Sequence, residues 1–135
     1  MRAVADAGGQ IIVAPNLSVP VGSAAVSRGL DWCPGVMTPS EAFAALDQNA
    51  SLLKFFPAEL MPPEAIGAMR AVLPKKAMVA AVGGMTPERL ADYQRAGTNA
   101  FGLGSALFKP DYALDDIAER AMRFVASAHA LSEAA

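Results

Sequence analysis

The chain has 135 residues, a length that predicts one domain spanning residues 1–135. Hydrophobic residues make up 53% of the sequence and charged residues 18%, a globular composition that excludes a disordered chain. The net charge is −2, Lys and Arg are scattered, and no apolar stretch reaches the roughly 18 residues of a membrane span, so we expect no nucleic-acid partner and no membrane partner.

The chain begins with a pattern that looks like the last turns of a helix. This pattern covers Met1–Ala7, and Gly8-Gly9 follows it as a stop. The first residues lack the apolar core of a signal peptide. The single cysteine, Cys33, excludes an intrachain disulfide and fits a reducing compartment, so we expect a cytoplasmic protein.

Five short apolar runs then alternate with helical patterns. We expect strands at Gln10–Ala14, Leu30–Cys33, Leu52–Phe56, Ala77–Val82 and Asn99–Leu103. Strands that alternate with helices imply right-handed crossovers and a parallel sheet. The fold class is therefore predicted to be α/β.

The helices carry recognisable start and stop residues. Thr38-Pro39-Ser40-Glu41 predicts a capping box with proline at the first helical position, and Thr86-Pro87-Glu88 repeats the cap and the proline. Gly29 and Gly97 predict left-handed stops. The apolar face of the last helix is expected to consist of Leu114, Ile117, Ala118, Ala121, Val125 and Ala128.

Five strand–helix units are too few for a complete (β/α)₈ barrel, which takes at least about 200 residues. A helix end in front of the first strand nevertheless suggests further units upstream, and three units would add about 75 residues. We therefore expect a partial TIM barrel with about five C-terminal βα units. An open five-stranded α/β sheet is the alternative.

A lysine lies in the middle of the third apolar run. Side chains alternate along a strand, so Leu52, Lys54 and Phe56 share one face, while Leu53 and Phe55 share the other. Burial between apolar faces disfavours the ammonium and lowers the pKa of Lys54, which makes a neutral amine available as a Schiff-base nucleophile. The alternative is a lysine at a strand end, with its stem buried and its head in solvent.

Glycine pairs end the last two runs, in Val82-Gly83-Gly84 and in Gly102-Leu103-Gly104-Ser105. Gly-rich turns let backbone N–H groups approach an anion, and in TIM barrels a common phosphate site follows strands 7 and 8. The pairs therefore favour phosphate binding, although glycines at such turns also occur for steric reasons alone. No His, Cys and carboxylate cluster has the spacing of metal ligands.

Taken together, these motifs resemble one enzyme family. The segments Leu53-Lys54-Phe55-Phe56-Pro57-Ala58-Glu59, Val82-Gly83-Gly84 and Gly104-Ser105 are similar to those of the 2-keto-3-deoxy-6-phosphogluconate and 2-dehydro-3-deoxy-6-phosphogalactonate aldolases. Ile12-Val13-Ala14-Pro15-Asn16 and Cys33-Pro34-Gly35 fit the preceding strands of the same family. The resemblance covers essentially the whole chain.

The resemblance implies a class I aldolase on a (β/α)₈ barrel, a homotrimer that uses no metal and no other cofactor. It implies that Lys54 is the Schiff-base lysine and that Pro15 lines the pyruvate end of the site. The substrate would be a phosphorylated keto-deoxy sugar acid, cleaved to pyruvate and glyceraldehyde 3-phosphate. The residues implied to hold its phosphate are Gly83, Gly84, Gly104 and Ser105.

Two residues bear on the substrate within this family. Val82 lies where the gluconate enzymes tend to have threonine, and Asn16 lies where they tend to have glycine. At both positions the sequence is more similar to the phosphogalactonate branch. The gluconate substrate is the alternative.

One functional residue of the family has no counterpart. The acid/base glutamate lies on the family's first three strands, which are absent here, and Glu59 belongs to the lysine motif instead. A non-catalytic fragment that binds a phosphosugar is thus a further alternative. Another is an isomerase-like barrel in which Lys54 acts electrostatically.

Overall fold

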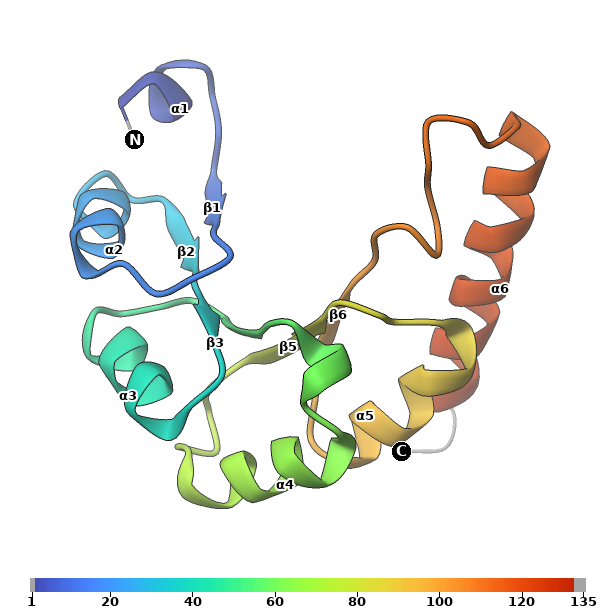
Figure 1. The fold of residues 1–135 in the computed structure, drawn as a ribbon. Helices are drawn as coiled ribbons and strands as arrows, with labels where there is room; N and C mark the ends of the chain where they lie inside the picture. The colour runs from blue at the N-terminus through green and yellow to red at the C-terminus, as the bar shows by residue number, and fades with distance from the viewer. Residues whose placement is uncertain (1, 133–135) are drawn as a thin grey trace.

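A computed structural model describes residues 2–132 as an open arc of strands with helices along its outer side (Figure 1). Met1, where the first expected helix began, lies outside the described residues. The helices are α1 Arg2–Asp6, α2 Val19–Val26, α3 Pro39–Asp47, α4 Pro63–Val72, α5 Leu90–Arg95 and α6 Leu114–Ser132, with 3₁₀ turns η1 Ala58–Leu60 and η2 Pro87–Arg89. The strands are β1 Ile11–Val13, β2 Asp31–Cys33, β3 Gly35–Val36, β4 Leu53–Phe55, β5 Val79–Val82 and β6 Ala100–Gly102.

The strands are parallel and follow one another in chain order. β1 pairs with β2, and β3, β4, β5 and β6 form the second group of neighbours. Sequential parallel strands with helices on the outer side form the wall of a TIM barrel, whereas a doubly wound sheet reverses its strand order and carries helices on both faces. The prediction of a partial barrel is therefore confirmed over the open-sheet alternative.

The expected strand at Leu30–Cys33 is present as β2, but it continues as β3, which the sequence pattern did not predict. Pro34 separates the two strands because it has no N–H for the ladder. Its carbonyl still accepts a hydrogen bond from the backbone N–H of Lys54 at 3.0 Å. Gly35 then lies opposite Lys54 in the β3–β4 pairing, so this segment joins the first unit to the lysine strand.

The core lies between the outer face of the strands and the helices. Its strand residues alternate with inward-facing ones, as the pleat requires. The main cluster includes Val36, Leu53, Phe55, Ile66, Met69, Val79, Ala81 and Tyr93. A second cluster surrounds Trp32, whose ring occupies the space over Gly22 of α2; a Cβ on that glycine would lie 2.4 Å from the ring.

Several predicted helix boundaries are confirmed. The Thr38 hydroxyl accepts from Glu41 N–H at 3.3 Å, and the Glu41 carboxylate accepts from Thr38 N–H at 2.9 Å, which completes the capping box. Gly8, Gly29 and Gly97 all have positive φ, as helix stops require.

The second predicted cap is only partly present. Thr86 and Pro87 begin a turn as expected, but this turn is the 3₁₀ segment η2, and the Thr86 side chain makes no capping hydrogen bond.

The buried face of α6 differs from the predicted one. Leu114 is 84% exposed and Val125 is 54% exposed, although both were assigned to the apolar face. The helix packs against η2 and α5, which are short, so it buries only a narrow stripe centred on Phe124, with Ile117 and Ala121 beside it. Within residues 2–132, none of the helices combines the length and apolarity needed to cross a bilayer.

Candidate active site

Lys54 lies in the middle of β4, on the inner face of the arc. Its neighbours Leu53 and Phe55 are fully buried in the core on the opposite face, as strand alternation predicted. The Lys54 residue is only 8% exposed, and its Nζ lies 4.4 Å from the centre of the Phe56 ring. The alternative of a lysine with its head in open solvent is therefore not what the structure shows.

The surroundings of Lys54 favour its neutral amine. Burial lowers the pKa of Lys54, and the nearby Cys33 thiol, whose thiolate form would attract the ammonium, acts in the opposite direction as a smaller effect. Burial likewise raises the pKa of Cys33, which keeps the thiol protonated and limits that attraction. Cys33 is thus a buried strand residue, as expected, but one that lies close enough to influence the lysine.

Small residues flank Lys54 on both neighbouring strands. Gly35 lies opposite it on β3, and Ala80 lies opposite it on β5. A Cβ on Gly35 would lie 2.1 Å from the Pro15 carbonyl oxygen, so only glycine lets the loop after β1 come this close. This approach places Pro15 one strand away from Lys54, where a ligand of the lysine could contact it.

The two glycine pairs follow neighbouring strands. Val82 of β5 pairs with Gly102 of β6, so both loops leave the sheet at the same edge. Gly83 and Gly84 have φ of 108° and 62°, values that glycine adopts without strain. Outside helices and strands, no backbone hydrogen bond of the described residues uses the N–H groups of Gly83, Gly84, Gly104 or Ser105. Both loops therefore offer backbone donors.

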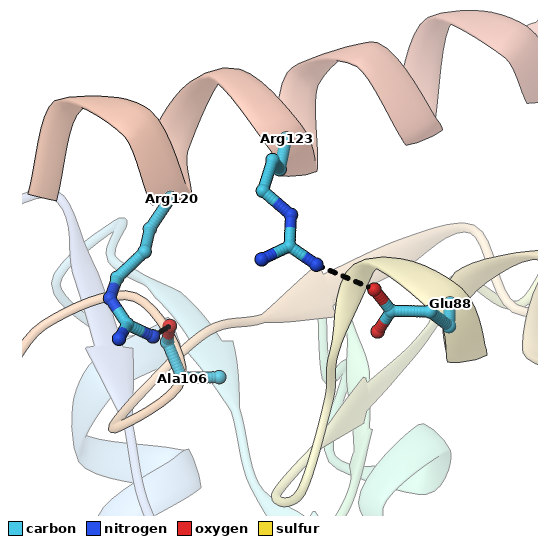
Figure 2. A network of polar contacts seen from close by, with 4 residues as sticks. All are labelled: Glu88, Ala106, Arg120 and Arg123. Atoms are coloured by element: carbon cyan, nitrogen blue, oxygen red, sulfur yellow. Dashed lines mark hydrogen bonds and ion pairs between the residues drawn. The ribbon is translucent and has the colours of Figure 1, made fainter. Parts of the chain in front are cut away.

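Two arginines of α6 contact the segments that follow β5 and β6 (Figure 2). Arg123 forms an ion pair with Glu88 of η2 at 2.8 Å, and Arg120 donates to the Ala106 carbonyl at 3.1 Å. The Arg120 guanidinium also lies 4.3 Å from the centre of the Tyr112 ring. These contacts connect the loop after β5 and the loop after β6 to one helix.

Two residues that the sequence analysis did not assign to the glycine loop contact it, Arg89 and Glu59, and Tyr93 is linked to the loop through Arg89. The Arg89 guanidinium donates to the Gly84 carbonyl at 2.6 Å and to the Tyr93 hydroxyl at 2.7 Å. Glu59 of η1 lies on the other side; a Cβ on Gly83 would be 2.5 Å from its carboxylate oxygen. The i, i+4 spacing of Arg89 and Tyr93 just after a glycine pair was the one available indication.

Among residues 2–132, no group of three or more His, Cys, Asp and Glu side chains is placed to hold a metal ion.

Comparison with known proteins finds one matching family model and similar proteins that are named as aldolases. A family model described as "Aldolase: KDPG and KHG aldolase" matches residues 1–121. The chain is 45% identical over 124 residues to a probable 2-dehydro-3-deoxy-6-phosphogalactonate aldolase of Rhizobium meliloti, covering 92% of this chain and 58% of that protein. It is 44% identical over 123 residues to the 2-dehydro-3-deoxy-6-phosphogalactonate aldolase of Escherichia coli, covering 91% of this chain and 60% of that protein.

Solved structures agree with these relatives. A structure described as native KDPGal matches with a TM-score of 0.94 and 41% identity, covering 98% of this chain and 64% of that one. The 2-keto-3-deoxy-6-phosphogluconate aldolase of Zymomonas mobilis, solved with 3-phosphoglycerate, matches with a TM-score of 0.77 and 26% identity, covering 91% of this chain and 58% of that one. The chain thus spans about three fifths of the length of these relatives, and it belongs to the KDPG and KHG aldolase family.

Proposed function

We propose that the chain carries the catalytic lysine and the phosphate-binding loops of a class I aldolase. The observation that carries this proposal is Lys54, a buried lysine on the inner face of the barrel wall whose pKa is lowered by burial. A Schiff-base lysine must attack as a neutral amine, and desolvation shifts Lys54 toward that form. The residues opposite it on the neighbouring strands are small, Gly35 on β3 and Ala80 on β5.

The proposed reaction is a retro-aldol cleavage. The Lys54 amine attacks the C2 ketone, water leaves, and an iminium forms. The electrons of the C3–C4 bond then move into the iminium, giving an enamine, while a base takes the C4 hydroxyl proton and C4 becomes an aldehyde. Protonation and hydrolysis of the enamine release pyruvate and restore Lys54. We assign none of the described residues to the base.

The loops after β5 and β6 are proposed to hold the substrate phosphate. This role is supported by four backbone N–H groups, those of Gly83, Gly84, Gly104 and Ser105. Among the described residues, none of these groups donates a backbone hydrogen bond outside the helices and strands. Glu59 lies against the glycine pair, so an anion there would require the exposed, flexible Glu59 side chain to turn away. Binding a remote phosphate supplies energy for orienting the reacting carbons.

The substrate that we propose is 2-dehydro-3-deoxy-6-phosphogalactonate. Its support is the 44–45% identity to relatives named for that substrate, against 32% to the KHG/KDPG aldolase of Escherichia coli. The gluconate and galactonate substrates differ in one hydroxyl configuration, and we propose that Val82 at the end of β5 and Asn16 in the loop beside Gly35 contribute to the choice between them.

The arrangement of the whole protein is also a proposal. Residues 1–135 would form a single domain that corresponds to the C-terminal part of a TIM-barrel aldolase. By similarity to the family, the protein would be cytoplasmic and would assemble as a homotrimer.

A coupled assay that follows pyruvate release tests the activity. Because no described residue is assigned to the base, we expect the chain alone to cleave slowly, and to cleave the phosphogalactonate substrate faster than the phosphogluconate one. Lys54→Arg should abolish cleavage because a guanidinium stays protonated, whereas the exposed-lysine control Lys76→Arg should not. Ser105→Ala removes the hydroxyl that we propose donates to the phosphate beside the Ser105 N–H, so it should raise KM for the phosphorylated substrate more than it weakens pyruvate binding.

Two results would contradict parts of the proposal. Cleavage that persists in Lys54→Arg would remove Lys54 from the mechanism. A wild-type chain that binds inorganic phosphate but releases no pyruvate from either substrate would support the non-catalytic alternative.

A further inference from the structure

A hydrogen-bonded bridge links the glycine loop after β5 to the segment that follows the lysine strand. Arg89 donates to the Gly84 carbonyl at 2.6 Å with one nitrogen and to the Tyr93 hydroxyl at 2.7 Å with the other. The Tyr93 hydroxyl in turn donates toward the carbonyls of Ala58 at 2.9 Å and Met61 at 3.2 Å. The bridge thus joins two loops that belong to different βα units.

The chemistry of the bridge leaves no polar group of Tyr93 unused. The residue is 1% exposed, and its hydroxyl has one proton and two lone pairs. The proton is shared between the carbonyls of Ala58 in η1 and Met61 just after it, and a lone pair accepts from Arg89. A planar guanidinium is needed at the other end because it presents several donors in a fixed geometry, which an ammonium cannot do.

The bridge acts on a part of the backbone that would otherwise be loosely defined. Gly83 and Gly84 are consecutive glycines with positive φ, and glycine restricts the backbone less than any other residue. The Gly84 carbonyl is the only atom of this pair for which the described residues show a hydrogen bond. Because the peptide unit is planar, holding the Gly84 carbonyl also fixes the Met85 N–H group and so restricts rotation of the Gly84 backbone next to it.

We propose that Arg89 and Tyr93 are positioning residues for phosphate binding: they hold the Gly83-Gly84 loop in one conformation and tie it to η1, four residues after Lys54. The inference rests on the proposed phosphate role of the two glycine loops. Arg89 acts here through the Gly84 backbone, and Tyr93 acts through Arg89. A backbone held in its binding conformation in advance loses less entropy when the anion binds.

The test is an NMR titration of the chain with inorganic phosphate, which follows the amide signals of Gly83, Gly84, Gly104 and Ser105. We expect saturable shifts in the wild type. Tyr93→Phe keeps every charge and the ring but removes the hydroxyl, so it should weaken phosphate binding about tenfold, equivalent to about 1.4 kcal/mol. Arg89→Gln should weaken it at least as much.

Two further variants separate positioning from simple charge. Arg89→Lys keeps the positive charge but cannot reach both acceptors in the same way, so we expect it to bind phosphate as weakly as Tyr93→Phe. Arg95→Gln is the matched control, because Arg95 ends α5, the helix that carries Tyr93, and among residues 2–132 it forms an ion pair only with the exposed Asp92. It should bind phosphate as the wild type does. Far-UV circular dichroism checks that each variant folds.

A second readout distinguishes local positioning from general loosening of the site. Formation of a pyruvate adduct on Lys54, trapped with borohydride, needs no phosphate and should remain close to the wild-type rate in Arg89→Gln. Phosphate binding that is unchanged in both Tyr93→Phe and Arg89→Lys would overturn the inference while leaving the phosphate role intact. Absence of phosphate shifts in the wild type would overturn both.

Discussion

Replacing Lys54 with methionine should change the stability of the fold in a pH-dependent way. Lys54 is 8% exposed, and its burial lowers its pKa below the ordinary value of 10.5. The unfolded chain therefore binds a proton at this lysine more tightly than the folded chain does. Between the two pKa values the free energy of unfolding must rise with pH, because the unfolded state holds more protons.

The size of the effect follows from linkage. With one proton difference, the slope is at most about 1.4 kcal/mol for each pH unit. Below the depressed pKa the wild type carries the full cost of a buried ammonium, so Lys54→Met should be the more stable protein there. Above about pH 10.5 this cost disappears. Methionine matches the length of the lysine stem and fills the same space without a charge.

Urea unfolding of wild type and Lys54→Met at several pH values from about 6 to 10 measures this difference. The stability of the wild type relative to the variant should rise as the pH is raised. Lys76→Met is the matched control, the same substitution at an exposed lysine. A constant difference for Lys54→Met would refute the claim that burial controls this amine.

Four further substitutions test the scaffold. Gly35→Ala should destabilise the fold by about 1–3 kcal/mol, because its Cβ would meet the Pro15 carbonyl oxygen at 2.1 Å. Gly67→Ala in α4 meets no atom within 4 Å and should stabilise the fold by about 1 kcal/mol. Thermal unfolding should therefore show a lower melting temperature for Gly35→Ala and a higher one for Gly67→Ala. Thr38→Ala should cost about 1 kcal/mol by removing the cap. Hydrogen bonds from the Met37 and Thr38 backbones lower the pKa of Glu41. The contribution of Glu41 to the free energy of unfolding should therefore be lost as the pH falls below about 4.5. Glu41→Gln should not show this pH-dependent loss of stability, and the same loss in the variant would contradict the role of Glu41.

Local patterns were sufficient to predict the features that depend on a few neighbouring residues. The alternation around Lys54 placed its side chain on the face opposite Leu53 and Phe55, and the structure agrees. The capping box at Thr38 and the left-handed stops at glycines likewise depend on residues within one turn. Each of these predictions used chemistry that is complete within a short segment.

Features that depend on distant segments were not predictable in the same way. The continuation of β2 into β3 requires β4 as a pairing partner, and the exposed Leu114 and Val125 on α6 follow from the short elements that this helix contacts. The bridge from Arg89 through Tyr93 reaches carbonyls more than 30 residues away in the chain, at sequence separations of 32 and 35. Helix periodicity specifies which residues share a face but not which of them meets a partner.

The most direct test of the central claim is to locate a trapped pyruvate adduct. Incubation of the chain with pyruvate and borohydride, followed by peptide mass spectrometry, should find a reduced adduct on Lys54, because borohydride converts an iminium to a stable amine. Lys75, Lys76 and Lys109 are exposed and should remain essentially unmodified. An adduct spread evenly over these lysines, or one that forms equally well in Lys54→Arg, would contradict the assignment of Lys54 as the Schiff-base residue.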